Sequence, residues 1–205
     1  MGSTLIFAFM RTRDEQKIES VYKEALKMIV KEGFEGFSMQ KLARAAGVSP
    51  ATIYIYFKDK EDLLLQLYRK VKEEYFEYIM KGFDPEMNFA TGLEVQWRNR
   101  SQYLIKRPDV GHFMENLTFS PLWKRALSEG DARFPETMKL FVKNAVRNKE
   151  LASMPGEVFW SAAFAPLYNL IRHHKAGVNH SGEKFTLTDE ILLQTLSFVL
   201  KGLRP

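Results

Sequence analysis

Apolar side chains recur every three or four residues along almost the whole chain, and this helical period is the feature that most limits its fold. The first clear example, between residues 13 and 31, consists of Ile18, Val21, Tyr22, Ala25, Met28 and Ile29. Such spacing puts the apolar side chains on one face of an amphipathic α-helix. Nowhere does the sequence alternate apolar and polar residues as a half-buried strand requires. The chain is therefore predicted to be all-α.

Glycine and proline divide this pattern into separate helices. Gly33 and Gly36 are expected to end the first helix, and the stretch from Lys81 to Asn88 is the clearest later break. Further helices are predicted at residues 59–81, 89–106, 108–119, 135–152, 157–175 and 189–203.

The stretch from Ser38 to Leu64 changes character every few residues. Ser38 can cap a short helix, and Gly47 can end it because glycine adopts a positive φ without a Cβ clash. Ser49 and Pro50 then suit the N-cap and the first position of a second short helix. Two short helices joined by a glycine-containing turn predict a helix-turn-helix.

The second short helix is expected to have two different faces. Ile53 and Phe57 lie four residues apart and are expected to face the core. Each residue rotates the helix by about 100°, so its other side chains cannot all point inward. Outward hydroxyl and methyl groups suit phosphate oxygens and thymine methyl groups in a DNA major groove. The alternative is a small helical turn whose aromatic residues pack in its own core.

The local charge also favours DNA. From Ser38 to Lys60 there are four basic residues and one acidic residue, and the whole chain carries a net charge of +5. Basic side chains near phosphates raise affinity by releasing counterions from the DNA. A mildly basic chain permits a polyanionic partner without requiring one.

The segment "GFSMQKLARAAGVSPATIYIYFKDKEDLL" resembles the N-terminal DNA-binding region of the TetR/AcrR family of transcriptional regulators. The resemblance covers about residues 13–75 and includes the Ala-Ala-Gly-Val-Ser turn and a Tyr-x-Tyr-Phe-Lys-x-Lys-Glu motif. It implies a ligand-responsive repressor that binds a palindromic double-stranded DNA operator as a homodimer. The DNA contacts that it implies fall on Ser38, Ser49, Pro50, Ala51, Thr52, Tyr54, Ile55, Tyr56 and Lys60. Ile55 departs from the pattern, since many relatives carry an aromatic or polar residue there.

Together these patterns predict the domain organisation. Residues 1–11 are a disordered extension or a start assigned too early, with Met10 as the true start. Residues 12–58 form the three-helix DNA-binding domain with its helix-turn-helix, and residues 59–81 form a connecting helix. Residues 82–205 form a helical domain for effector binding and dimerisation.

The last two predicted helices, residues 157–175 and 189–203, are apolar nearly all round. A helix that is apolar on every face has to be buried on every face. One recognition helix also reads only a few base pairs, so small DNA-binding proteins commonly act as dimers. These two helices are therefore predicted to form a homodimer interface, with an ordinary core inside one chain as the alternative.

The middle helices are rich in aromatic residues and poor in polar ones. The resemblance implies an effector pocket among them, and aromatic walls suit an apolar or aromatic small molecule. At helical spacing the same residues also suit an ordinary core. The candidate effector-binding residues are Gln96, Trp97, Arg100, Phe113, Leu117, Trp123, Phe141 and Tyr168, of which Gln96 and Arg100 are polar.

Several other classes of protein are disfavoured. The chain has no cysteine, which excludes disulfides and thiolate metal sites and makes a reducing cytoplasm the expected location. No apolar run approaches the roughly 18 residues that span a bilayer, so no membrane partner is expected. His173, His174 and His180 lie near one helix end, but no carboxylate completes a ligand set, so neither a metal nor another cofactor is expected.

An enzyme is not predicted, because the sequence holds no Gly-rich phosphate loop and no Ser/His/Asp arrangement. Two rival functions stay open. An all-helical enzyme or small-molecule carrier would use the helix-turn-helix only as structure. An activator or a regulator without a ligand would still bind DNA.

Overall fold

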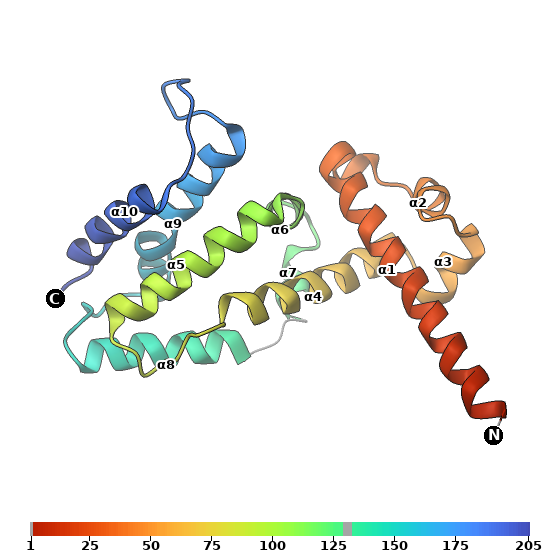
Figure 1. Cartoon of the computed structure of the whole chain (residues 1–205), viewed down its shortest axis with the longest axis horizontal. Helices are drawn as coiled ribbons and strands as arrows, with labels where there is room; N and C mark the ends of the chain where they lie inside the picture. Colours follow the sequence, from red (N-terminus) through yellow and green to blue (C-terminus); the bar gives the residue numbers. More distant parts are fainter. Residues whose placement is uncertain (1, 129–132) are drawn as a thin grey trace. The chain divides into compact units, whose positions relative to one another are not determined.

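The computed structural model describes residues 2–128 and 133–205, with side chains from Asp14 onward except that of Arg133. Over these ranges the elements are all helices, apart from one isolated antiparallel bridge between Val178 and Lys184, which confirms the predicted all-α class. The helices are α1 (Gly2–Gly36), α2 (Met39–Ala45), α3 (Pro50–Tyr56), α4 (Lys60–Ile79), α5 (Phe89–Lys106), α6 (Pro108–Thr118), α7 (Trp123–Ser128), α8 (Arg133–Arg147), α9 (Gly156–Ala176) and α10 (Asp189–Gly202) (Figure 1).

These helices form two compact units. The first contains α1 to α3, the part of α4 up to Val71, and α6 and α7. The second contains the rest of α4, together with α5, α8, α9 and α10. The functional boundaries predicted at residues 58 and 81 stay predictions, because packing alone does not assign function to a segment.

In the first unit, α1 packs on α2 through an apolar stripe that includes Val21, Ala25 and Ile29, all buried. The helix begins at Gly2, earlier than the stripe that predicted it, and its helical geometry breaks at Gly33, where φ is +68°. Glycine adopts this left-handed value without a Cβ clash, so the predicted stop at Gly33 is confirmed. Whether residues 1–11 are an extension or a mis-assigned start stays a prediction.

The first unit also holds a segment that the sequence did not connect with it. Phe113 of α6 meets Phe34 edge to face with ring centroids 6.1 Å apart. Trp123, at the start of the unpredicted short helix α7, meets Tyr68 of α4 at 6.3 Å. Aromatic pairs in this geometry are stabilising beyond their buried area, so α6 and α7 belong to the same core as α1 and α4.

The second unit is organised around α5, which packs against α8, α9 and α10. Leu93 and Trp97 of α5 are fully buried, and the Trp97 indole N–H donates to the carbonyl oxygen of Ala163 in α9 at 2.9 Å. The predicted helix at residues 135–152 is shorter than expected, because Lys149 adopts a left-handed φ of 59° after α8. The released chain then bonds elsewhere: the Ala152 N–H donates to the Leu203 carbonyl at 2.9 Å.

Within the described residues, no helix combines the length and the apolar character that a membrane span requires.

Gly92 provides a direct test of how tightly α5 and α8 pack. A Cβ atom added at Gly92 would lie 2.5 Å from a ring carbon of Phe141. Alanine gains about 1 kcal/mol in helix propensity, but overpacking a well-packed core costs about 1–3 kcal/mol. We therefore expect Gly92→Ala to lower the melting temperature measured by circular dichroism.

Gly156→Ala is the matched control, because a Cβ there meets nothing within 4 Å and φ is not positive. We expect the control to melt at the wild-type temperature or above. A Gly92→Ala protein as stable as the control would contradict the close packing of α5 on α8.

Candidate nucleic-acid interface

The turn between α2 and α3 is built as the sequence predicts. Gly47 has φ of +68°, and its N–H donates to the Arg44 carbonyl at 3.2 Å. The next N–H, of Val48, reaches back to Ala43 at 3.0 Å, so two carbonyls at the end of α2 are satisfied. Val48, between Gly47 and Ser49, is half-buried. Gly47 therefore ends α2 and directs the chain into α3.

The start of α3 is fixed by its cap. The Ser49 hydroxyl accepts a hydrogen bond from the Thr52 N–H at 3.1 Å, and Pro50 occupies the first turn. This cap confirms the predicted roles of Ser49 and Pro50. Ser38 has the extended backbone of an N-cap before α2, but its side chain makes no capping bond, so the predicted Ser38 cap is wrong.

The two faces of α3 differ sharply in exposure. Ile53 and Phe57 are each 1% exposed, and the Phe57 ring meets Tyr22 of α1 with centroids 5.6 Å apart. On the opposite side, Tyr54 is 54% exposed and Ile55 is 74% exposed. The predicted division of α3 into a core face and an outward face is therefore confirmed. We name the exposed residues the recognition face: Ser49, Pro50, Ala51, Tyr54 and Ile55.

Other residues proposed for DNA contact are partly engaged within the fold. Tyr56 is half-buried, and partial desolvation together with a hydrogen bond to Asp14 of α1 raises the pKa of its hydroxyl. Thr52 is half-buried, and its hydroxyl lies 2.8 Å from that of Ser49. The recognition face therefore depends on its two most exposed large residues, Tyr54 and Ile55.

Lys60, at the start of α4, has a structural role that the sequence did not reveal. Its Nζ donates to the Phe34 carbonyl at the end of α1, at 2.6 Å, and lies 5.7 Å from the centre of the Phe37 ring. Asp59 accepts from the Asp62 N–H at 2.8 Å, so a carboxylate already occupies part of this helix start. Lys60 keeps two further N–H donors for a phosphate.

Basic side chains surround the recognition face unevenly. Arg44 and Lys58 are exposed. Lys41 forms an ion pair with Glu32 at 2.8 Å, and this hydrogen bond, with the charge of Lys41, holds the pKa of the Glu32 carboxyl below its usual range. The pair leaves Arg44 and Lys58 as the more available cations.

Comparison with known proteins identifies this arrangement. Residues 21–67, which include α2 and α3, match the sequence model for bacterial regulatory proteins of the tetR family. The structure is similar to that of a TetR family transcription regulator from Marinobacter aquaeolei, with a TM-score of 0.78, 25% identity, and coverage of 95% of this chain and 98% of the other. Residues 21–67 thus match a TetR-family DNA-binding region, and both comparisons support a TetR family regulator. The resemblance noted in the sequence is thereby confirmed.

Two curated relatives match shorter parts of this chain. An uncharacterized HTH-type transcriptional regulator of Haemophilus influenzae is 31% identical over 49% of this chain and 54% of its own length. The fatty acid metabolism regulator protein of Bacillus subtilis is 34% identical over 30% of this chain and 31% of its own length. The chain thus spans about half, or less, of the length of these relatives.

The candidate effector-binding residues are divided between the two units. Phe113 and Leu117 are buried and Trp123 is half-buried, all in the first unit. In the second unit Gln96, Trp97, Arg100 and Phe141 are buried, whereas Tyr168 is 40% exposed.

Some of these candidates hold the second unit together. The Gln96 side-chain amide donates to the Ile79 carbonyl at 2.9 Å, which ties α5 to the end of α4. Phe141 stacks on Phe89 with ring centroids 5.6 Å apart. Their role in binding an effector stays a prediction.

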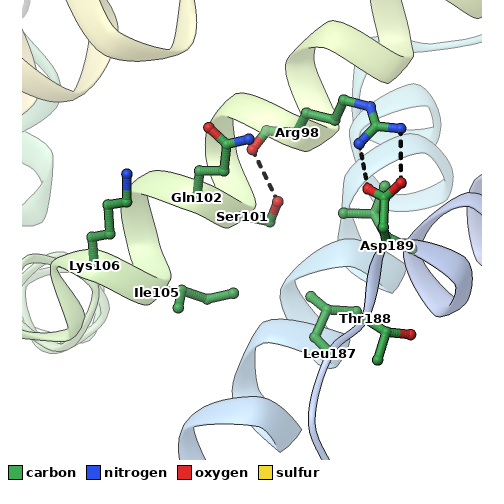
Figure 2. Close-up of a pocket in the computed structure, with 9 residues that line it drawn as sticks. Arg98, Ser101, Gln102, Ile105, Lys106, Leu187, Thr188 and Asp189 are labelled. Carbon is green, nitrogen blue, oxygen red and sulfur yellow. Dashed lines mark hydrogen bonds and ion pairs between the residues drawn. The ribbon is translucent and has the colours of Figure 1, made fainter.

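The second unit has two hollows whose lining residues the sequence did not indicate. One, of about 240 Å³, lies between α5 and the start of α10 (Figure 2). Figure 2 shows Arg98 facing Asp189 through two contacts, of which the Nη2–Oδ2 distance is 3.2 Å. The other hollow, of about 520 Å³, is lined by residues that include Asn88, Lys149 and Arg204. None of the eight candidate effector residues lines either hollow.

The histidines take part in loop structure. His174 Nδ1 accepts from the Leu187 N–H at 3.1 Å, and His173 Nδ1 lies 3.2 Å from the Val178 carbonyl oxygen. The part of the chain that the structure describes contains no group of three His, Cys, Asp or Glu residues placed to hold a metal ion.

The two isoleucines of α3 separate folding from surface contact. We expect Ile53→Ala to lower the free energy of unfolding by about 2–5 kcal/mol, because it empties a buried site. Ile55→Ala should change it by no more than about 0.5 kcal/mol, because the side chain is largely solvated. Urea denaturation followed by circular dichroism compares them. Equal losses in the two variants would contradict this assignment of faces.

Proposed function

We propose that this TetR-family protein is a DNA-binding transcriptional repressor that binds a palindromic operator as a homodimer and is released by a small-molecule effector. The observation that carries the proposal is the recognition face, where Tyr54 and Ile55 are exposed on a helix fixed by Ser49 and Gly47. A transcriptional regulator acts beside the chromosome, so the proposed location is the bacterial cytoplasm.

The recognition face supplies contacts of two kinds. The Tyr54 and Ser49 hydroxyls are suited to phosphate or base-edge acceptors, and the Ile55 methyl groups suit a thymine methyl group in the major groove. Arg44, Lys58 and the remaining donors of Lys60 add phosphate contacts, which strengthen binding at low salt. Ser38, Pro50, Ala51, Thr52 and Tyr56 complete the proposed set of DNA-contacting residues.

The proposed homodimer uses α9 and α10. Val158 of α9 and Phe198 of α10 are 50% and 64% exposed. Large apolar residues grouped on two helices mark a surface suited to burial by a partner. A second copy of the chain is the proposed partner, because two recognition helices are needed to read two half-sites.

The proposed release works through α4. This helix is continuous from Lys60 to Ile79, and residues of both units belong to it. An effector bound in the second unit would change the tilt of α4 and hence the spacing of the two recognition helices. Half-sites in such operators are about 34–36 Å apart, so a change in spacing weakens binding.

The effector cannot be taken from the names of relatives. The Bacillus subtilis fatty acid metabolism regulator protein matches only 61 residues of this chain. That match supports a TetR family regulator. The chemical class of the effector has to be inferred from the residues of the second unit.

The recognition face can be tested with DNA from the region upstream of the protein's own gene. We expect Tyr54→Ala/Ile55→Ala to weaken binding about 10-fold or more, since specific base contacts contribute about 1–3 kcal/mol each. Fluorescence anisotropy measures the affinity. The logarithm of the wild-type binding constant should fall linearly with the logarithm of salt concentration.

Lys139→Ala, at an exposed position of α8, is the control and should bind DNA as the wild type does. Affinity that is independent of salt, or unchanged in the double variant, would count against the proposal. Catalytic turnover without DNA affinity would instead support the rival enzyme.

The homodimer makes a separate prediction. We expect Phe198→Lys to be monomeric in sedimentation velocity, because an unpaired ammonium group would be buried in an apolar interface. Val178→Lys is the matched control: Val178 is also exposed, at 41%, but lies outside both helices. A dimeric Phe198→Lys protein, or a monomeric wild type, would contradict the proposed interface.

A further inference from the structure

Arg100 is a buried cation in the centre of the second unit. Its side chain extends from α5 and is 2% exposed. Nη1 donates to the Tyr75 hydroxyl oxygen at 2.9 Å. Nε and Nη2 are also buried, and neither has a hydrogen-bond partner among the described residues. Buried polar groups nearly always have a partner, so two empty donors on one guanidinium require an explanation.

No described acidic residue balances this charge. The buried polar or charged residues of the described chain are Gln96, Arg100, Ser101 and Asn144, and none of them carries a carboxylate. Arginine stays protonated in proteins. Burial raises the pKa of Tyr75, so its phenol stays neutral and supplies no negative charge.

Arg98, two residues earlier on the same helix, shows the contrast. It is partly exposed and forms ion pairs with both Glu94 and Asp189. The carboxylates of this region therefore pair with the solvent-facing arginine, where water already screens charge. The buried arginine, which needs a counter-ion more, has none in the described part of the unit.

The surroundings of Arg100 are aromatic. Its guanidinium carbon lies 4.6 Å from the ring centre of Phe164, 5.5 Å from that of Phe134 and 5.8 Å from that of Tyr75. Aromatic faces stabilise the cation but cannot accept its remaining N–H bonds in the manner of an oxygen. The site is thus a cation surrounded by aromatic rings, with the Tyr75 and Tyr168 hydroxyls nearby and with Nε and Nη2 free of hydrogen bonds to described residues.

The two spare donors have a specific shape. Nε and Nη2 lie next to each other on one edge of the planar guanidinium, so their N–H bonds run nearly parallel. This edge matches the two oxygens of a carboxylate in a bidentate pair. The arrangement therefore selects a planar anion with two oxygens rather than a neutral polar group.

Residues of α9 connect this site with the surface. Trp160 is 39% exposed and stacks on Phe164, with ring centroids 4.8 Å apart. Tyr168 is 40% exposed, and its hydroxyl oxygen lies 3.4 Å from that of Tyr75. One layer of side chains thus separates Arg100 from solvent. Neither hollow described above is lined by Arg100, so a ligand reaches it only when these side chains move.

We propose that Arg100 binds the carboxylate of the effector through Nε and Nη2, and that the effector is a monocarboxylic acid with an apolar body packed against Phe134, Trp160 and Phe164. This inference rests on the proposed function for the existence of an effector, and it names the chemical class. The aromatic box holds the body, and the guanidinium distinguishes an acid from a neutral molecule of the same shape.

The test uses pairs of probes that differ only in charge. Sodium decanoate and decanamide represent an aliphatic body, and sodium 2-naphthoate and 2-naphthamide represent an aromatic one. Isothermal titration with the full-length wild type should show at least one acid binding about 10-fold or more tightly than its amide, as expected for a charge-assisted bidentate pair. The pair of probes that shows the preference identifies the kind of body.

Arg100→Met keeps a long side chain and removes the charge. We expect this variant to bind acid and amide equally, and to melt at the wild-type temperature or above without ligand, because an unbalanced buried charge is gone. Arg98→Met is the matched control on the same helix and should keep the preference for the acid. Equal binding of acid and amide to the wild type, or a preference that survives in Arg100→Met, overturns the inference.

A further measurement separates this inference from the proposed function. Without ligand, Arg100→Met should bind operator DNA as the wild type does, and the preferred acid should release DNA only from the wild type. If the wild type and both variants fail to bind DNA while the wild type still prefers the acid, the proposed repressor is refuted and the proposed acid site is supported. DNA binding with no preference for an acid would refute the acid site alone.

Discussion

The second unit depends on the burial of the inward face of α5, and with it on partners for the polar groups that this face carries. Trp97 donates to Ala163 of α9, and Gln96 donates to Ile79 at the end of α4. Each bond replaces one that water would have made. Within the described residues the Gln96 Oε1 oxygen and the Arg100 Nε and Nη2 nitrogens are buried without a partner, and of these two residues only Arg100 carries a charge. Desolvating an ion costs several kcal/mol, whereas a cation–aromatic contact returns roughly 2 kcal/mol at best. A group that the fold leaves unbalanced is where chemistry from outside the chain is expected.

Local signals allowed much of the first unit to be predicted. Gly47, Ser49 and Pro50 act within a few residues of themselves, and the phase of Ile53 and Phe57 needs only the helical period. These effects depend on backbone geometry and on the distinction between apolar and polar side chains, both of which can be read from sequence. Ser38 shows the limit even here, because a suitable residue at an N-cap does not have to turn its hydroxyl toward the helix.

Contacts between distant residues could not be predicted in the same way. The bond from Lys60 to Phe34 joins residues 26 positions apart, and the pairing of Arg98 with Asp189 spans 91. Helical spacing predicts that an aromatic residue is buried, but it does not predict which unit the residue is buried in. Phe113 and Phe141 therefore looked equivalent in sequence, although they belong to different units. Among the described residues no carboxylate lies beside Arg100, and this too is a property of the packed unit that has no signature in any local motif.

Folding and recognition use different side chains of one seven-residue helix, α3. The Ile53 side chain is 1% exposed, while that of Ile55, two residues later, is 74% exposed. Substitutions at Tyr54 or Ile55 can therefore accumulate during evolution without lowering the stability of the folded protein at each step. Under the proposed function, the preference for an operator can diverge while the scaffold and the proposed effector site are inherited unchanged. Specificity for DNA and specificity for effector would then evolve independently, which allows one architecture to serve many regulatory circuits.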